Sequence, residues 1–131
     1  MQVDTPQVLF KNRHLGRPAT LAEYRAGGGY EALAATIGQR TPAEVLQLVL
    51  DADLRGRGGA GFPAGRKWQG VPTDHVGTRY VVVNTDEMEP GTFKDRILVN
   101  ADPHLVIEGI VLCAYSIGAS EGVFFIRPSY E

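Results

Sequence analysis

The sequence predicts an α/β fold in which a parallel βαβ unit follows an N-terminal helical segment. A short run rich in β-branched residues, Tyr80 to Val83, is typical of a strand buried on both faces. Residues 103–117 form a long apolar segment with helical spacing, and residues 122–127 (GVFFIR) form a second apolar run. Strands joined through a helix pair in parallel, so this order of elements places the two strands side by side.

The N-terminal part, residues 1–53, is expected to form an arm and three helices. Residues 1–19 show no periodicity and are punctuated by proline and glycine, so we expect an extended arm. Thr20 is a potential N-cap for a helix over 21–26. A second helix is expected over 30–37, where apolar residues share one face.

The third helix has the clearest start signal in the chain. Thr41 is followed by Pro42 at the first helical position and by Glu44 three residues after the cap, which is a capping box with the favoured proline. Apolar residues then recur at helical spacing to about Asp53. This helix leads directly into a glycine-rich stretch that begins at Leu54.

Residues 54–131 are expected to contain the βαβ unit and one further helix. Glycine, proline and polar residues predict a connection over 70–78. A helix is expected over 93–99, and Asp102 is a potential cap for the apolar helix, which ends at Gly118. Because that helix is apolar nearly all round, we expect other elements to cover more than one of its sides.

The stretch Leu54–Trp68 (LRGRGGAGFPAGRKW) combines five glycines with three arginines and one lysine. Backbone N–H groups in such a loop can cradle a phosphate whose charge the basic side chains balance. We interpret the stretch as a nucleotide or flavin cradle, and the alternative is a flexible linker. Gly56, Gly58 and Gly61 match G-x-G-x-x-G, but the helix expected before them argues against the dinucleotide fingerprint, which requires a strand there. The Gly-Lys-Ser/Thr of a P-loop is also absent.

A second polar loop, residues 84–92, follows the first predicted strand. It carries three carboxylates, on Asp86, Glu87 and Glu89. Ligands of open α/β sheets bind beyond the carboxyl ends of the strands, so this acidic loop and the basic glycine-rich loop are candidates for two sides of one site. The alternative is a solvated turn whose acids cap the next helix.

Composition limits the classes of function. The chain has 131 residues, enough for one domain with a core, and its net charge of −2 gives no sign of nucleic-acid binding. A single cysteine, Cys113, excludes an internal disulfide and a cysteine-ligated cluster built by this chain alone, and the three histidines lack metal-ligand spacing. No secretory signal and no apolar run long enough to span a bilayer are visible. We therefore expect a protein of the cytoplasm or matrix side, in a reducing compartment, without a metal site in this chain.

Three motifs in order, LRGRGGAGFPAGRKW, VVNTDEMEPGTFKDR and PHLVIEGI, resemble the flavoprotein subunit of NADH:quinone oxidoreductase (respiratory complex I). They also resemble the diaphorase subunits of NAD-linked hydrogenases and formate dehydrogenases. The resemblance covers residues 20–127 and only the N-terminal part of that subunit. It implies that residues 54–131 are the first half of a Rossmann-like domain that binds FMN and NADH. In that family the subunit takes a hydride from NADH onto FMN and passes electrons to iron–sulfur clusters.

The resemblance also implies roles for individual residues. The residues expected at FMN are Gly56, Arg57, Gly58 and Gly59 at its ribityl phosphate and ring edge, Lys67, and Asn84, Asp86 and Glu87 at its isoalloxazine and ribityl groups. The residues expected at NADH are Phe62, which would stack on the adenine, and Glu89, which would face the nucleotide and tune its binding. No protein acid or base is implied, because the hydride moves directly between the cofactors.

The resemblance implies partners as well. The family's second flavin-binding stretch and its four-cysteine cluster motif lie beyond residue 131, so an iron–sulfur cluster is expected only there or in partner subunits. The expected partners are the remaining part of the flavoprotein subunit, or a chain that replaces it, and iron–sulfur subunits of a complex peripheral to a membrane. Two alternatives stay open: a non-catalytic assembly piece that binds no flavin, and an anion-binding module for another nucleotide.

Overall fold

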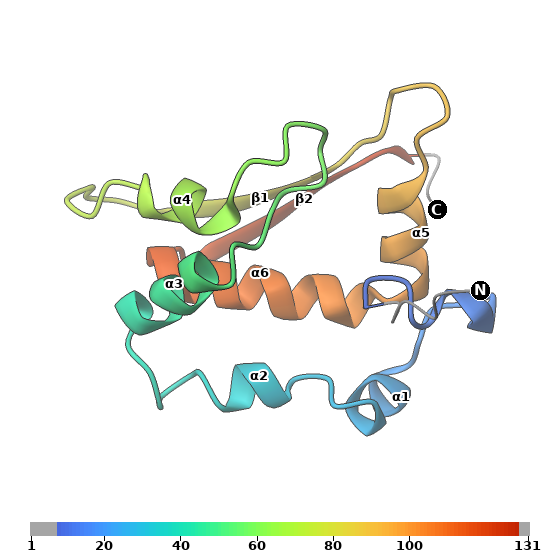
Figure 1. The fold of residues 1–131 in the computed structure, drawn as a ribbon, viewed down its shortest axis with the longest axis horizontal. Coiled ribbons are helices and arrows are strands. Elements are labelled where there is room, and N and C mark those ends of the chain that lie inside the picture. Colours follow the sequence, from blue (N-terminus) through green and yellow to red (C-terminus); the bar gives the residue numbers. More distant parts are fainter. Residues whose placement is uncertain (1–7, 129–131) are drawn as a thin grey trace, which may run out of the picture.

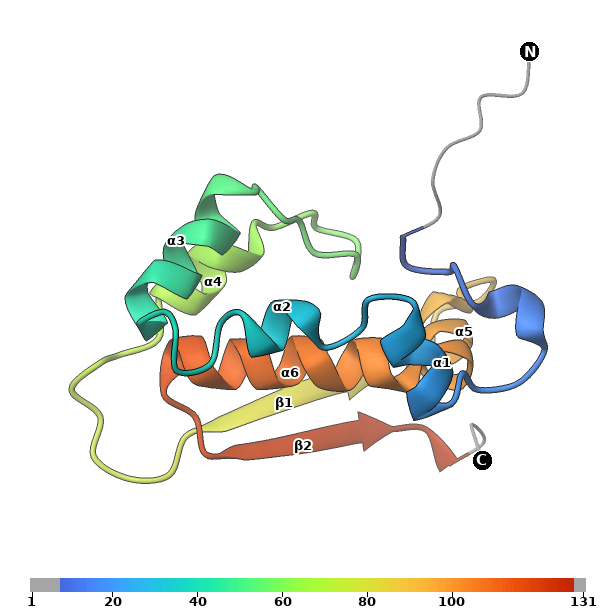
Figure 2. The same ribbon diagram turned by 90° about the horizontal axis from the view of Figure 1, so that it is seen from below.

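The computed structural model describes residues 8–128 and shows one helix surrounded by the other elements. In chain order these are a 3₁₀ helix (Arg13–Leu15), α1 (Leu21–Ala26), α2 (Glu31–Ala34), α3 (Pro42–Asp51), α4 (Ala64–Gln69), β1 (Tyr80–Thr85), α5 (Lys94–Ala101), α6 (Pro103–Ile117) and β2 (Glu121–Ile126). Helix α6 lies at the centre, with both strands on one side and α1 and α2 on the other (Figure 1). Figure 2 shows α5 at one end of α6 and the pair α3 and α4 near the other. The predicted α/β fold is confirmed.

The two strands pair in parallel, as predicted. Tyr80 lies opposite Glu121 and Val82 opposite Val123, and the register continues to the ends of both strands. One face of the sheet is open, because Tyr80, Val82 and Phe125 expose 58%, 63% and 56% of their surfaces. The expectation that the first strand is buried on both faces is therefore wrong: α6 covers one face, and no element within residues 8–128 covers the other.

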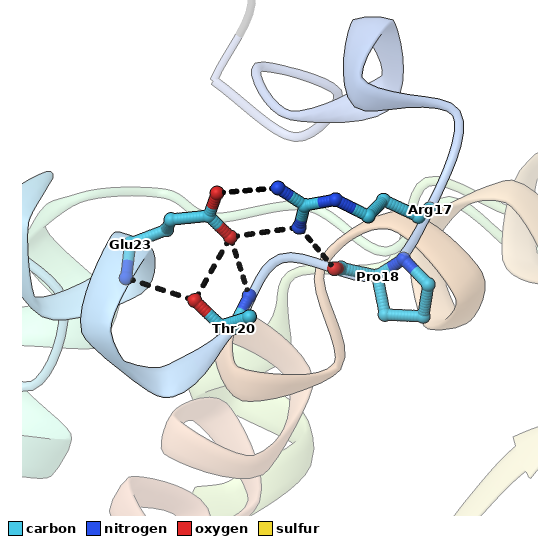
Figure 3. Close-up of polar contacts among 4 residues, drawn as sticks. All are labelled: Arg17, Pro18, Thr20 and Glu23. Carbon is cyan, nitrogen blue, oxygen red and sulfur yellow. Dashed lines mark hydrogen bonds and ion pairs between the residues drawn. The ribbon is translucent and has the colours of Figure 1, made fainter.

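Helices α1 and α3 are capped by residues of their own first turns. At α3 the Thr41 hydroxyl accepts the N–H of Glu44 (3.3 Å), and the Glu44 carboxylate accepts the N–H of Thr41 (2.7 Å). Thr20 and Glu23 make the same pair of hydrogen bonds at α1 (Figure 3). Arg17 adds a bidentate ion pair to Glu23, with N–O distances of 2.6 and 2.9 Å. The predicted N-caps at Thr20 and Thr41 are confirmed.

Helix α2 has no capping side chain of its own and begins after Tyr30, whose backbone is left-handed (φ 65°). Its N-terminus is capped from α6, where the Glu108 carboxylate accepts the N–H groups of Tyr30 (2.9 Å) and Leu33 (3.1 Å). The same carboxylate accepts the Tyr24 hydroxyl at 2.5 Å. Glu108 is buried, so one side chain of α6 fixes both α1 and α2.

The side chain of Tyr24 is the centre of the packing between α6 and the N-terminal helices. It is only 2% exposed, and its ring lies edge-on to Tyr30 (5.1 Å between centroids) and stacked on His104 (5.7 Å). A Cβ at Gly29 would come within 2.2 Å of the Tyr24 ring, so only glycine fits there. No sequence pattern indicated this aromatic cluster.

Several elements differ from their predicted extents. The helix expected over 30–37 is a regular α-helix only over Glu31–Ala34. The Thr36 N–H donates to the Leu33 carbonyl, which is the spacing of a 3₁₀ helix, and the chain continues in turns. The stretch 54–68 contains a helix, α4, that was not expected. The arm expected over 1–19 forms turns and a 3₁₀ helix from residue 8 onward, and residues 1–7 lie outside the described part. The remaining predicted helices and strands agree with the structure within about two residues.

Asp102 does not cap α6 through its side chain, contrary to expectation. It is 1% exposed, and its Oδ2 accepts a hydrogen bond from the Asn12 amide at 2.8 Å, so the carboxylate holds the N-terminal segment instead. At the other end of α6, Gly118 is the left-handed C-cap that was predicted (φ 67°).

No single helix within residues 8–128 is long and apolar enough to cross a membrane. Helices α5 and α6 reach the required length only together, and the angle between them is 99°.

Candidate functional site

The glycine-rich loop and the acidic loop after β1 form the walls of one cleft. Its volume is about 520 Å³, within the range of small-molecule sites. The lining residues are Arg57, Gly58, Gly59, Asn84, Asp86, Glu87, Glu89, Thr92, Lys94 and Asp95. The acidic wall directly follows the carboxyl end of β1, the position where ligands of α/β sheets bind. The structure therefore brings together the two loops that sequence analysis paired.

A narrow hairpin presents the glycine-rich wall. Arg55 and Pro63 form an antiparallel bridge at its base, and the Gly56 N–H donates to the Phe62 carbonyl at 2.9 Å. Gly59, near the tip, has a φ of 109°, a backbone conformation that side chains with a Cβ rarely adopt. The hairpin stem thus holds a glycine tip out over the cleft.

The glycines of this stretch have two different environments. A Cβ at Gly58 or Gly59 would meet no heavy atom within 4 Å, so the backbone of the tip is open to an approaching ligand. A Cβ at Gly65 would lie 2.8 Å from the backbone nitrogen of Leu50, so this glycine allows α4 to pack directly against α3. The high glycine content therefore serves both an open cleft and a close helix contact.

Asp86 has a carboxylate oxygen beside the cleft that has no hydrogen-bond partner among residues 8–128. Its backbone N–H donates to the Asn84 side-chain oxygen (3.1 Å), which fixes the turn after β1. The Asp86 Oδ1 atom is buried and accepts no hydrogen bond from residues 8–128. Buried carboxylate oxygens normally have donors, so this atom indicates a place for the N–H or O–H group of a ligand.

Glu87 is held inside the protein by the start of α5. Its side chain is 3% exposed and accepts hydrogen bonds from the Lys94 ammonium and the Arg96 N–H, each at 3.3 Å. Burial alone would raise the pKa of Glu87, but the N–H groups of Asp95 and Arg96 and the Lys94 charge outweigh it and hold that pKa below its usual value. Arg127 fixes the adjacent backbone by donating to the Glu87 carbonyl (3.1 Å). An acid of this loop thus caps the next helix, as the alternative interpretation suggested, but that acid is Glu87 and not Asp86.

Three of the predicted cofactor residues, Gly56, Phe62 and Lys67, do not line this cleft. Gly56 lies in the hairpin stem, and Phe62 is 55% exposed. Lys67 lines a separate pocket of about 420 Å³ between α4, β1 and α6, together with Cys113. Burial raises the pKa of the Cys113 thiol to about 11, and the Lys67 charge opposes this shift. The cofactor contacts of these three residues stay predictions.

Sequence analysis missed three residues of the cleft: Thr92, Lys94 and Asp95. With them, the lining holds four carboxylates and two cationic side chains. No group of three or more His, Cys, Asp or Glu side chains in the described part of the chain is arranged to hold a metal ion. The signal that was overlooked is Lys94, the first residue of the helix after three acids, because a positive side chain is attracted to nearby carboxylates.

Comparison with known proteins identifies the family of this chain. Residues 49–131 match the family model of the Nuo51 FMN-binding domain. The chain belongs to this family. The matched region contains both walls of the cleft, both strands and the central helix. The resemblance seen in the three sequence motifs is confirmed.

The Nuo51 family assignment is supported by individual relatives. The F 2 subunit of the NADH-quinone oxidoreductase of Rhizobium meliloti (strain 1021) is 49% identical over 123 residues, or 94% of this chain and 29% of that protein. The F subunit of the NADH-quinone oxidoreductase of Aquifex aeolicus (strain VF5) is 46% identical over 126 residues, or 96% of this chain and 29% of that protein. A crystal structure of an NAD⁺-reducing [NiFe]-hydrogenase in the H2-reduced state matches with a TM-score of 0.69 and 39% identity, over 88% of this chain and 19% of that chain. The chain thus spans 29% of the length of these two oxidoreductase relatives.

Proposed function

We propose that the cleft binds FMN and that this protein oxidises NADH through that flavin. The observation that carries the proposal is the buried Asp86 Oδ1, which has no partner in the described part of the chain and lies beside a cleft whose other wall is open glycine backbone. A flavin complements both walls, because it has N–H and O–H donors for a carboxylate and a flat ring that requires close backbone approach. Membership of the Nuo51 FMN-binding domain family supports the same ligand.

Each wall has a role under this proposal. Arg57, Gly58 and Gly59 provide backbone N–H groups and one positive charge to the flavin. Gly56, whose N–H is bonded to Phe62 in the hairpin stem, and Lys67, which lines the neighbouring pocket, are assigned to the flavin by the family resemblance alone. Asn84 and Asp86 accept hydrogen bonds from the flavin ring and ribityl chain. Glu87 is assigned to the flavin as well, although α5 already occupies its carboxylate. These residues bind and orient the cofactor and contribute charge around it.

The nucleotide is assigned to the outer part of the cleft. Phe62, which is largely exposed, would stack on the adenine of NADH. Glu89 is exposed on the acidic wall and would face the nucleotide. Its negative charge repels the phosphates of any bound nucleotide and thereby favours release of the product. Bound FMN supplies the hydride acceptor, and no acid or base from the protein is required.

We propose that the protein works as one component of a larger oxidoreductase on the cytoplasmic or matrix side of a membrane. Its two relatives from Rhizobium meliloti and Aquifex aeolicus are named as subunits of NADH-quinone oxidoreductases, which supports this assembly. The ligands of an iron–sulfur cluster would come from partner subunits or from a further part of the flavoprotein subunit, because Cys113 is the single cysteine of this chain. The final electron acceptor would be set by those partners.

The test is a pair of charge-neutralising variants in the acidic wall. Asp86→Asn should reduce the flavin content of the purified protein, because the amide replaces the acceptor that a flavin donor requires. Glu89→Gln is the matched control; it should keep the flavin and bind NADH more tightly by about 1 kcal/mol. Flavin is measured by its absorbance and nucleotide affinity by titration. A wild-type protein without flavin, or an Asp86→Asn variant with full flavin content, would contradict the proposal.

A second candidate function is a non-catalytic assembly piece. The observation that favours it is the open, apolar face of the sheet, where Tyr80, Val82 and Phe125 are exposed. Such a face fits a protein that docks on a partner and needs no cofactor. Flavin bound by the wild-type protein excludes this candidate as the whole function, whereas a colourless protein that still assembles with partners would support it.

A further inference from the structure

Lys94 connects two carboxylates in the wall of the cleft. Its ammonium lies 3.3 Å from Glu87 Oε1 and 2.7 Å from Asp95 Oδ2. The Lys94 side chain is 33% exposed, whereas that of Glu87 is 3% exposed. The lysine therefore reaches from the cleft surface to a carboxylate that is nearly shut off from water.

The buried position of Glu87 depends on this contact. An ionised carboxylate loses its hydration on burial and stays charged only with donors and a counter-charge around it. The N–H of Arg96 supplies one donor at the start of α5, and Lys94 supplies a positive charge. If the lysine charge is removed, the buried carboxylate keeps its backbone N–H donors but loses this counter-charge, which favours uptake of a proton or movement toward solvent.

A movement of Glu87 would displace the rest of the acidic loop. Asp86 precedes it directly, and Glu89 follows two positions later, so the backbone that carries Glu87 also sets where these two side chains point. We propose that Lys94 is a positioning residue for the flavin: it holds Glu87 against α5 and thereby fixes the Asp86 carboxylate at the cleft. This inference rests on the proposed FMN site.

The charge of Lys94 matters to the cleft as well as to the fold. The lining contains four carboxylates, on Asp86, Glu87, Glu89 and Asp95, and Lys94 contacts two of them. FMN carries a phosphate, and without this lysine Arg57 would be the remaining cationic side chain among the lining residues, against four carboxylates, so an anionic ligand would be bound less favourably. Both effects predict weaker flavin retention when the charge is lost.

The experiment compares the rate of FMN release from the complete protein as it is purified with its flavin. Lys94→Met should release FMN about tenfold faster than wild type, because the buried Glu87 carboxylate loses the ammonium group that donates to it. Lys94→Arg keeps the charge and should stay within about twofold of wild type. Lys11→Met removes a lysine charge remote from the cleft and should leave the release rate unchanged. Release is followed by the fluorescence of free FMN after dilution.

A double-mutant cycle separates positioning through Glu87 from a general loss of stability. Glu87→Gln alone should also speed release, and Lys94→Met combined with Glu87→Gln should release FMN no faster than the worse single variant. Wild-type release from Lys94→Met, no rescue by Lys94→Arg, or additive effects in the double variant would each overturn the inference while leaving the FMN site intact. If Lys94→Met does not fold, Lys94→Gln must show the same acceleration. Wild-type protein without flavin would overturn the proposed FMN site and, with it, this inference.

Discussion

Helices α1 and α3 differ from α2 and α5 in where their N-terminal caps come from. Glu23 and Glu44 cap the helices in which they lie, and both are exposed to solvent. Glu108 caps α2 from a position 78 residues away from Tyr30, and Glu87 caps α5 from the acidic loop. These two distant carboxylates are buried, with 7% and 6% of their surfaces exposed.

The comparison shows two different roles for a helix cap: a local cap stabilises the helix in which it lies, whereas a buried cap from another element also connects that element to the helix. A local cap satisfies N–H groups that water would otherwise reach, so its loss weakens a single helix by about 1 kcal/mol. A buried distant cap satisfies groups that water cannot reach, so its loss leaves several unpaired donors inside the protein at a cost of about 1–3 kcal/mol for each group. The two regions should therefore respond very differently to removal of their caps.

The largest effect is expected at Glu108. Glu108→Gln keeps the size of the side chain but replaces one acceptor oxygen with an NH₂ group that cannot accept from Tyr24, Tyr30 or Leu33. We expect the free energy of unfolding to fall by about 3 kcal/mol, measured by urea denaturation. Tyr24→Phe, which removes only the hydroxyl donor, is the control and should cost about 1 kcal/mol. Equal losses in the two variants would show that Glu108 does not join the two helices.

A smaller effect is expected at the local cap of α3. Thr41→Ala removes the hydroxyl that accepts the Glu44 N–H, so the free energy of unfolding should fall by about 1 kcal/mol. Thr78→Ala, in an exposed loop, makes the same chemical change away from a helix start and should leave stability unchanged. A loss at Thr41 as large as that at Glu108 would remove the distinction between local and distant caps.

The smallest effect is expected at the exposed cap of α1, and it should depend on pH. Hydrogen bonds from Arg17 and Thr20 hold the pKa of Glu23 well below its ordinary value of 4.5. A carboxylate with a lowered folded-state pKa contributes stability that is complete above the unfolded pKa and is lost as the pH falls through the folded value. Arg17→Ala should therefore lower stability slightly at pH 7, and its difference from wild type should shrink below about pH 4.5. The measurement is urea denaturation at pH 7 and below about pH 4.5. Arg25→Ala, at the other end of α1, is the control, and its stability difference from wild type should be the same at both pH values.

The same comparison explains which parts of the fold were predictable. The capping box at Thr41 and the glycine stop at Gly118 are signals carried by adjacent residues, and the structure contains both. The cap from Glu108 is a contact between residues 75 or more positions apart, and no local pattern marks it. The cap from Glu87 spans nine residues, and the acidic loop before the helix suggested a cap of this kind without identifying which acid makes it. Asp102 shows the converse, because its sequence position suggested a cap and tertiary packing used the carboxylate elsewhere.

The candidate site was also predictable in part: the two loops that form it were predicted, and the helix within the glycine-rich stretch was not. Two loops of opposite charge, one of them after a strand, were enough to place Gly58 and Asp86 in one cleft. The helix inside the glycine-rich stretch was not predicted, because Gly65 is a poor helix former and only its contact with Leu50 explains its presence. That helix carries Lys67, which lines the neighbouring pocket and not the cleft.

The parallel pairing of β1 and β2 also determines the order in which the chain can fold. Tyr80 meets Glu121 only when the whole crossover through α5 and α6 has been closed, and closing such a loop costs entropy before any strand contact forms. Helix α6 contacts every other α-helix and both strands, so it can gather these elements before the sheet exists. We expect the transition state for folding to contain α6 and its contacts, with strand pairing completed afterwards.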